Sequence, residues 1–135
     1  MSRQLFVNLA VENLDRSVEF FTKLGFTFNP LYTDETGTCM ILGESNFVML
    51  LTREKFASFI PHPVSDAKQS AEVMLALSCD SREEVDEQVR LAIEGGGTTY
   101  GEPRVYDFMY SHGYQDLDGH IWEVFYMDES KFPKS

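Results

Sequence analysis

The chain has 135 residues, of which 43% are hydrophobic and 13% aromatic, which is enough for one packed core and too many for a disordered chain. Its formal net charge of −11 disfavours nucleic acids and anionic membrane surfaces as partners. No apolar stretch approaches the ~20 residues of a membrane-spanning helix, so we expect a soluble protein with no nucleic-acid and no membrane partner.

The first half of the chain predicts one strand, one helix and three further strands. Residues 5–11 are predicted as the first strand. Apolar residues recur at helical spacing in residues 14–24, which predicts a helix there. Either Asn13 or Asp15 is suited to cap the start of this helix, and Gly25 ends it. Three β-rich runs follow, separated by turn residues, at 26–33, 38–43 and 46–52.

The second half repeats this order of elements. A strand is predicted at residues 72–78, and Ser81 with Glu84 has the spacing of a capping box. The helix that follows carries an apolar stripe made of Val85, Val89, Ala92 and Ile93. Three consecutive glycines, 95–97, end it. The remaining strands are expected at 98–105, 108–115 and 120–127.

The matching order and spacing indicate duplication of one supersecondary unit. We expect an α+β fold of two βαβββ modules, at residues 3–53 and 71–127, within a single domain, 1–135. Residues 54–70 are predicted as the connector, in which Pro61 and Pro63 exclude regular structure.

Both cysteines, Cys39 and Cys79, lie in apolar runs, and neither belongs to a CxxC pair. This pattern is typical of buried free thiols and gives no support to a zinc knuckle or a redox motif. Two cysteines in a chain of this length indicate a reducing compartment. Polar residues interrupt the short apolar run at the N-terminus, so we expect no signal peptide and a cytoplasmic location.

Two segments at opposite ends of the chain carry a family resemblance. They are Val11–Ser17, with Phe20-Phe21 and Leu24-Gly25-Phe26, and the closing run Asp116–Val124. With the βαβββ–βαβββ order, the chain resembles the vicinal oxygen chelate superfamily, which includes glyoxalase I, extradiol dioxygenases, fosfomycin-resistance enzymes and bleomycin-resistance proteins. The resemblance covers residues 3–127 and implies curved mixed sheets around a cup, and a homodimer. It does not identify the reaction, because function resides in the site and not in the fold.

In metal-dependent members of the superfamily, four strand positions supply the metal ligands. By the resemblance, those positions here are Phe6, Met49, Met74 and Glu123. Phenylalanine has no donor atom, a methionine thioether suits soft metals, and one carboxylate does not replace a set of three or four ligands. We therefore expect no metal and no cofactor at these positions.

Side chains alternate along a strand, so residues two apart share a face. If Phe6 faces the cup, the cup is mostly apolar and has Asn8, Ser78 and Glu123 as its polar points. This composition is typical of a pocket for a small molecule, and a filled barrel core has the same composition. The expected ligand-binding residues on these strands are Phe6, Asn8, Met49, Met74 and Ser78.

The last hairpin adds candidate catalytic residues. A four-residue turn at 116–119 places His112 opposite Glu123, whereas a two-residue turn at 118–119 places Tyr114 there. Both registers keep Tyr110, His112 and Tyr114 on the face of Glu123, and an odd-length loop turns all three away. A His–Glu pair in an apolar cup exchanges a proton near neutral pH, but it also serves as a structural hydrogen bond.

Two classes of function remain. The first is a metal-free protein that binds a small apolar or aromatic molecule, as bleomycin-resistance proteins do. The second is a lyase, isomerase or dioxygenase-type enzyme that uses Glu123 and His112 as acid and base, or a metal at an atypical site. In the first case Tyr110 and Tyr114 join the ligand-binding residues.

Overall fold

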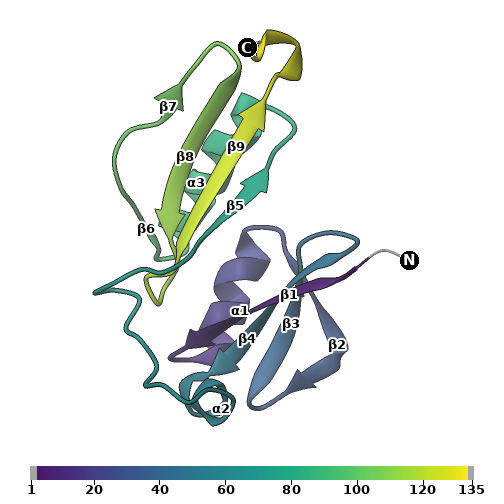
Figure 1. The fold of residues 1–135 in the computed structure, drawn as a ribbon, viewed down its shortest axis with the longest axis vertical. Helices are drawn as coiled ribbons and strands as arrows, with labels where there is room; N and C mark the ends of the chain where they lie inside the picture. Colours follow the sequence, from purple (N-terminus) through teal and green to yellow (C-terminus); the bar gives the residue numbers. More distant parts are fainter. Residues whose placement is uncertain (1–2, 134–135) are drawn as a thin grey trace. The chain divides into compact units, whose positions relative to one another are not determined.

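The computed structural model describes residues 3–133, so the outermost residues of the predicted domain 1–135 lie outside the described range. The chain divides into two compact units, one ending at Asp66 and the other beginning at Ala67 (Figure 1). The boundary falls inside the connector predicted at residues 54–70, and each unit contains one predicted repeat. That the two repeats form a single domain stays a prediction.

Among the described residues, the first unit forms a four-stranded mixed sheet with the order β1-β4-β3-β2. β1 runs parallel to β4, and the other neighbours are antiparallel. Its elements are β1 (Leu5–Val11), α1 (Leu14–Lys23), β2 (Thr27–Asp34), β3 (Gly37–Ile41), β4 (Asn46–Thr52) and α2 (Arg53–Ser58). The predicted βαβββ order is confirmed, and α2 occupies the start of the connector.

Local signals decide where α1 begins and ends. The Asn13 side chain accepts a hydrogen bond from the Arg16 backbone N–H at 3.1 Å, so Asn13 is the N-cap. Gly25 follows the helix with a φ of 100°, a conformation that glycine adopts without steric cost. Phe20 and Phe21 are buried, which packs α1 against one face of the sheet.

The second unit repeats the pattern with a five-stranded sheet, ordered β5-β9-β8-β6, in which β7 also pairs with β8. Its described elements are β5 (Met74–Ser78), α3 (Arg82–Glu94), β6 (Thr98–Thr99), β7 (Arg104–Val105), β8 (Met109–Gln115), β9 (Ile121–Met127) and the 3₁₀ turn η1 (Glu129–Lys131). The continuous strand predicted at 98–105 is wrong. Residues 100–103 leave the ladder, and Gly101 has a φ of 61° there.

The N-terminus of α3 differs in detail from a reciprocal capping box. Ser81 Oγ accepts from the Glu84 backbone N–H at 3.1 Å, as predicted. The Glu84 carboxylate, however, accepts from the backbone N–H of Asp80 at 2.8 Å. Along the helix, Val85 and Val89 are buried, whereas Ile93 is 48% exposed, so its place in the predicted core stripe is wrong. Ile93 is four residues after Val89 and belongs to the same face, but it lies in the last turn of α3, next to the final residue Glu94.

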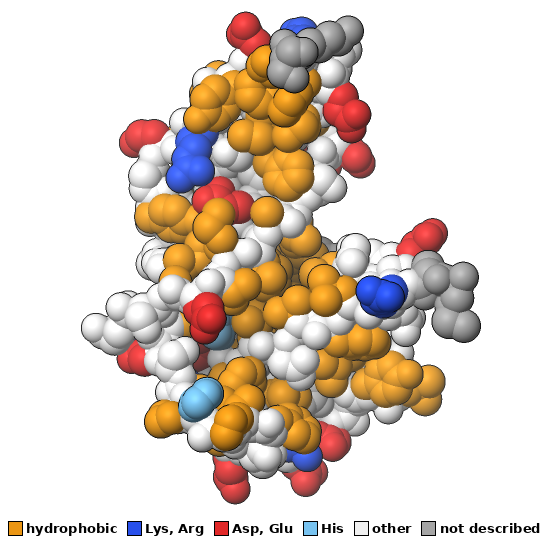
Figure 2. Space-filling view, viewed as in Figure 1, with side chains coloured by type: hydrophobic (Ala, Val, Ile, Leu, Met, Phe, Trp, Pro, Cys, Tyr) orange, Lys and Arg blue, Asp and Glu red, His pale blue; other side chains and the backbone are white. Residues whose placement is uncertain are grey.

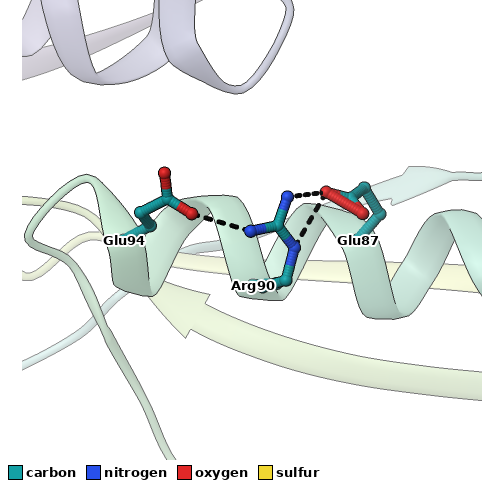
Figure 3. A network of polar contacts seen from close by, with 3 residues as sticks. All are labelled: Glu87, Arg90 and Glu94. Atoms are coloured by element: carbon teal, nitrogen blue, oxygen red, sulfur yellow. Dashed lines mark hydrogen bonds and ion pairs between the residues drawn. The ribbon is translucent and has the colours of Figure 1, made fainter.

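The solvent face of α3 carries paired charges. Arg90 donates hydrogen bonds to Glu87 and, at 2.7 Å, to Glu94, three and four residues away (Figure 3). The two carboxylates raise the pKa of the Arg90 guanidinium, chiefly through the hydrogen bond to Glu87. None of the described helices is long and apolar enough to cross a membrane.

The turn between β8 and β9 is built on the carboxylate of Asp116. Its Oδ1 accepts from the backbone N–H groups of Asp118 and His120, each at 3.0 Å. Its Oδ2 accepts from the indole N–H of Trp122, which is fully buried, also at 3.0 Å. Gly119 completes the turn with a φ of 90° and donates its N–H to the Asp116 carbonyl. Burial raises the pKa of the Asp116 carboxyl, and the nearby His120 opposes this rise.

This turn decides the register of the hairpin. It comprises residues 116–120, an odd number, because the residues on either side of it pair with each other. Gly113 therefore stands opposite Glu123, and His112 stands opposite Val124. Both registers predicted from the sequence are wrong, because the Asp116 hydrogen bonds close a longer turn than either prediction assumed.

The Asp116 turn gives a testable prediction. Asp116→Asn replaces one carboxylate oxygen by an N–H₂ group, so an acceptor for either the turn amides or the Trp122 indole is lost. We expect the free energy of unfolding in urea to fall by about 1–3 kcal/mol, the cost of a buried donor without an acceptor. Asp107→Asn, at an exposed carboxylate of the same unit, is the matched control and is expected to change stability by less than about 0.5 kcal/mol. Equal stability of the two variants would contradict this role for Asp116.

Candidate functional site

One face of the first-unit sheet is covered by α1 (Figure 1), and the other face carries three of the predicted site residues, Phe6, Asn8 and Met49. Val48 and Leu50 are fully buried in the core, so their neighbours Phe47, Met49 and Leu51 point to the opposite side of β4. The register pairs Phe6 with Phe47, Asn8 with Met49 and Ala10 with Leu51. The prediction that these residues share a face is therefore confirmed for this unit.

This open face is apolar and hollowed. The rings of Phe6 and Phe47 stack with centroids 4.8 Å apart and planes 17° from parallel. Beside them lies a hollow of about 440 Å³, which Phe6 and Met49 line together with residues 31–34 of β2. Leu31 and Tyr32 at its edge are 85% and 57% exposed. Figure 2 shows hydrophobic side chains gathered on the side of this unit that faces the viewer.

A second hollow, of about 380 Å³, lies at the other end of the same face. Its walls are Asn8 and Leu51 from the sheet, Phe56 from α2, and Phe59 and Ile60 from the segment after α2. The Asn8 amide donates to the Phe6 carbonyl at 3.3 Å, so the polar side chain is held against its own strand. The connector thus supplies an apolar wall that the sequence analysis did not assign.

In the second unit, Glu123 lies on the face away from α3. The register places Met74, Ala76 and Ser78 of β5 beside Ile121, Glu123 and Phe125 of β9. The shared face predicted for Met74, Ser78 and Glu123 is confirmed. Glu123 is 8% exposed, and its cross-strand neighbours Ala76 and Gly113 have no polar side chain.

Tyr100 is the partner of Glu123, and the sequence analysis missed it. Its hydroxyl donates to Glu123 Oε1 at 3.0 Å. The ring lies over Gly113, where an added Cβ would stand 2.3 Å from the Tyr100 oxygen, so residue 113 has to be glycine for this contact. Burial, followed by the hydrogen bond to Glu123, raises the pKa of Tyr100 to about 12, so the phenol keeps its proton at neutral pH. The sequence signal for this contact is Gly113, which stands opposite Glu123, but it can be recognised only when the register of the hairpin is known.

The three residues predicted to accompany Glu123 lie on the α3 side of the sheet. The Tyr110 hydroxyl donates to Asp86 on α3 at 2.5 Å. Tyr114 is fully buried, with its ring stacked against Trp122. The His112 ring nitrogen Nε2 lies 3.2 Å from Thr99 Oγ1 and 3.3 Å from the Gly101 carbonyl oxygen. The register therefore removes the cross-strand pairing with Glu123 that made His112 a candidate base.

The donor chemistry at the four family metal positions does not fit a hard divalent metal. In the first unit, Phe6 offers no donor atom, and Met49, which stands beside Asn8, offers a soft thioether. In the second, Met74 offers a soft thioether, and Glu123 already accepts from Tyr100. Among residues 3–133, no three His, Cys, Asp or Glu side chains cluster in a way that could hold a metal ion.

Comparisons with known proteins agree with this fold. The family model "Bleomycin resistance protein-like N-terminal" matches residues 3–43. Hypothetical protein SA1046 from S. aureus is 30% identical, with a TM-score of 0.79 over 93% of this chain and 95% of that one. A glyoxalase/bleomycin resistance protein/dioxygenase family enzyme from Burkholderia phytofirmans PsJN is 16% identical, with a TM-score of 0.77 over 93% of this chain and 99% of that one.

Lactoylglutathione lyase from Agrobacterium tumefaciens is 16% identical, with a TM-score of 0.68 over 98% of each chain. No curated protein matches the sequence. The chain belongs to the vicinal oxygen chelate superfamily, as the resemblance indicated. The predicted α+β fold class with two βαβββ modules is likewise confirmed.

The contact between Tyr100 and Gly113 predicts a coupling between two substitutions. Gly113→Ala forces the Tyr100 ring away and is expected to destabilise the protein by about 1–3 kcal/mol, as overpacking does. In a Tyr100→Ala background the same change meets no ring and is expected to cost less than about 0.5 kcal/mol. Urea unfolding of the four proteins of this cycle measures the coupling, and additive effects would refute the contact.

The raised pKa of Tyr100 predicts a pH dependence. A folded-state pKa of about 12 stands above the ordinary value of 10.0, so the native state holds this proton more tightly than the unfolded state. The stability from this group is complete below pH 10.0 and is lost as the pH rises toward 12. The difference in unfolding free energy between wild type and Tyr100→Phe is therefore expected to shrink over that interval. Other tyrosines titrate alike in both proteins and cancel, so a constant difference would count against the assignment.

Proposed function

We propose that this protein binds a small apolar or aromatic molecule on the open face of the first-unit sheet, without a metal ion. The observation that supports this most directly is the stacked pair of Phe6 and Phe47 beside a hollow of about 440 Å³. A volume of this size is in the ordinary range of small-molecule pockets. The ring of Phe6 is 39% exposed and is backed by the half-buried ring of Phe47, so it provides flat apolar surface on which an aromatic ligand gains both area burial and ring stacking.

The chemistry of this face favours binding over catalysis. Besides the aromatic pair, it presents Met49 and Leu51, and Asn8 is its polar point, held by the Phe6 carbonyl. A thioether adapts its shape to a ligand and makes favourable contacts with aromatic rings. Asp34 is the one acid that borders the hollow of about 440 Å³, and its Oδ1 already accepts hydrogen bonds from Thr36 and from the Gly37 backbone N–H.

The enzymatic alternative requires Glu123 and His112 to act on one substrate. The observed register places these two side chains on opposite faces of the second-unit sheet. The cross-strand acid–base pair predicted from the sequence is therefore not formed, although both residues border one hollow of the second unit, and we favour binding. We also propose that the protein is a homodimer, the commonest symmetric assembly, and that it is located in the cytoplasm.

The proposal is tested with 2-naphthol, a neutral aromatic probe whose fluorescence reports its transfer out of water. We expect saturable binding to the wild type that EDTA does not change. Phe47→Leu keeps apolar volume and removes the ring, and is expected to weaken binding about three- to tenfold, which corresponds to the ~0.5–1.5 kcal/mol of an aromatic contact. Phe132→Leu, at an exposed ring of the second unit, is the matched control and is expected to leave affinity unchanged.

Two outcomes would overturn the proposal. One is equal affinity of wild type and Phe47→Leu, which would place the probe elsewhere. The other is loss of binding on metal removal, which would show that a metal takes part. A circular-dichroism melt of each variant establishes that the fold is retained before affinities are compared.

A further inference from the structure

The second unit has a hollow of its own, of about 180 Å³, whose lining is polar and charged. The charged and titratable residues at its border are Tyr100, Glu102, Arg104, His112 and Glu123. Residues 100–103 leave the β ladder at this point, and the Tyr100 ring occupies the space over Gly113 at the border of the hollow. About 180 Å³ is roughly six times the ~30 Å³ that one water molecule occupies in the liquid, so the hollow accommodates a molecule of a few heavy atoms.

The carboxylate of Glu123 lines this hollow with incomplete hydrogen bonding. The residue is 8% exposed, and Tyr100 donates one hydrogen bond, to Oε1. No other described residue donates to this carboxylate. An ionised carboxylate has about four acceptor sites, and a buried one is stabilised when several donors, preferably charged, face it. The second carboxylate oxygen of Glu123, Oε2, is therefore suited to accept a hydrogen bond from a cationic group of a bound molecule.

The guanidinium of Arg104 borders the same hollow and is also without an ion pair among the described residues. Where acidic partners stand at suitable spacing, arginine in this chain does pair, as Arg90 does with Glu87 and Glu94 (Figure 3). Arg104 is close enough to lower the pKa of Tyr100 slightly, against the larger effect of burial. Charges of opposite sign thus line one small space without forming an ion pair with each other.

We propose that this hollow binds a compact molecule carrying both an ammonium and a carboxylate group, the chemical class of the small amino acids. The ammonium group of the ligand donates to the Glu123 carboxylate, next to the Tyr100 hydroxyl. The carboxylate of the ligand accepts two parallel hydrogen bonds from the planar guanidinium of Arg104. Glu102 adds a second negative charge at the border, so the hollow disfavours an anion that has no ammonium group. This inference does not rest on the binding of an aromatic molecule by the first unit.

Isothermal titration calorimetry with three matched probes tests the inference. Glycine carries both groups, methylamine carries the cation alone, and acetate carries the anion alone. We expect glycine to bind at least about tenfold more tightly than either single-charge probe, because it makes charge-assisted hydrogen bonds at both of its ends. Equal binding of glycine and methylamine would overturn the role of Arg104, and absence of glycine binding at millimolar concentration would overturn the site.

Variants separate the two ends of the ligand. Arg104→Gln, at an exposed side chain, is expected to weaken glycine binding about tenfold and to leave methylamine binding unchanged. Glu123→Gln is expected to weaken both probes. Glu87→Gln and Arg90→Gln change the same charges on α3 and are expected to alter neither affinity. If Glu123→Gln fails to fold, the Arg104→Gln result decides alone, and an unchanged glycine affinity there contradicts the proposal.

Discussion

The carboxylate of Asp116 is the interaction on which the second unit depends. It joins two backbone N–H groups of the turn and the buried Trp122 indole in one set of hydrogen bonds. Because this set closes a turn of odd length, it decides which side chains of β8 share a face with those of β9. Gly113 then stands opposite Glu123, Tyr100 enters the space that glycine leaves, and a charged hollow opens beside them. A buried carboxylate is costly, as its raised pKa indicates, and the three donors offset that cost.

The two units have the same βαβββ order and present different chemistry on their open faces. In the first, β1 and β4 bring together two phenylalanine rings, a methionine and a leucine, so the face is suited to an apolar or aromatic molecule. In the second, the equivalent face holds an acid, a phenol and a nearby guanidinium. Membership of the vicinal oxygen chelate superfamily thus establishes the framework and leaves the ligand to individual side chains. Of the four positions that supply the ligands in metal-dependent members, only Glu123 carries a donor for a hard metal.

Much of the fold could be predicted because its signals are local. Asn13 and Ser81 cap helices through hydrogen bonds to residues three positions away, and Gly25 ends α1 through its own backbone conformation. That Phe6 shares a face with Asn8, and Met74 with Ser78, could be predicted from the two-residue period of a strand. The failures have a different cause. The strand predicted at 98–105 breaks because Tyr100 leaves the ladder to reach Glu123, 23 residues further along the chain.

The sequence by itself determined the superfamily, the order of the elements, and which residues alternate on each strand, since composition, capping and periodicity act within a few residues. Only the tertiary structure decided the hairpin register, and with it the partner of Glu123. The physical reason is that a change of one residue in a turn reverses every side chain on a strand at small local cost. In this protein the choice came from a buried carboxylate and an indole, a contact between side chains that no local pattern encodes.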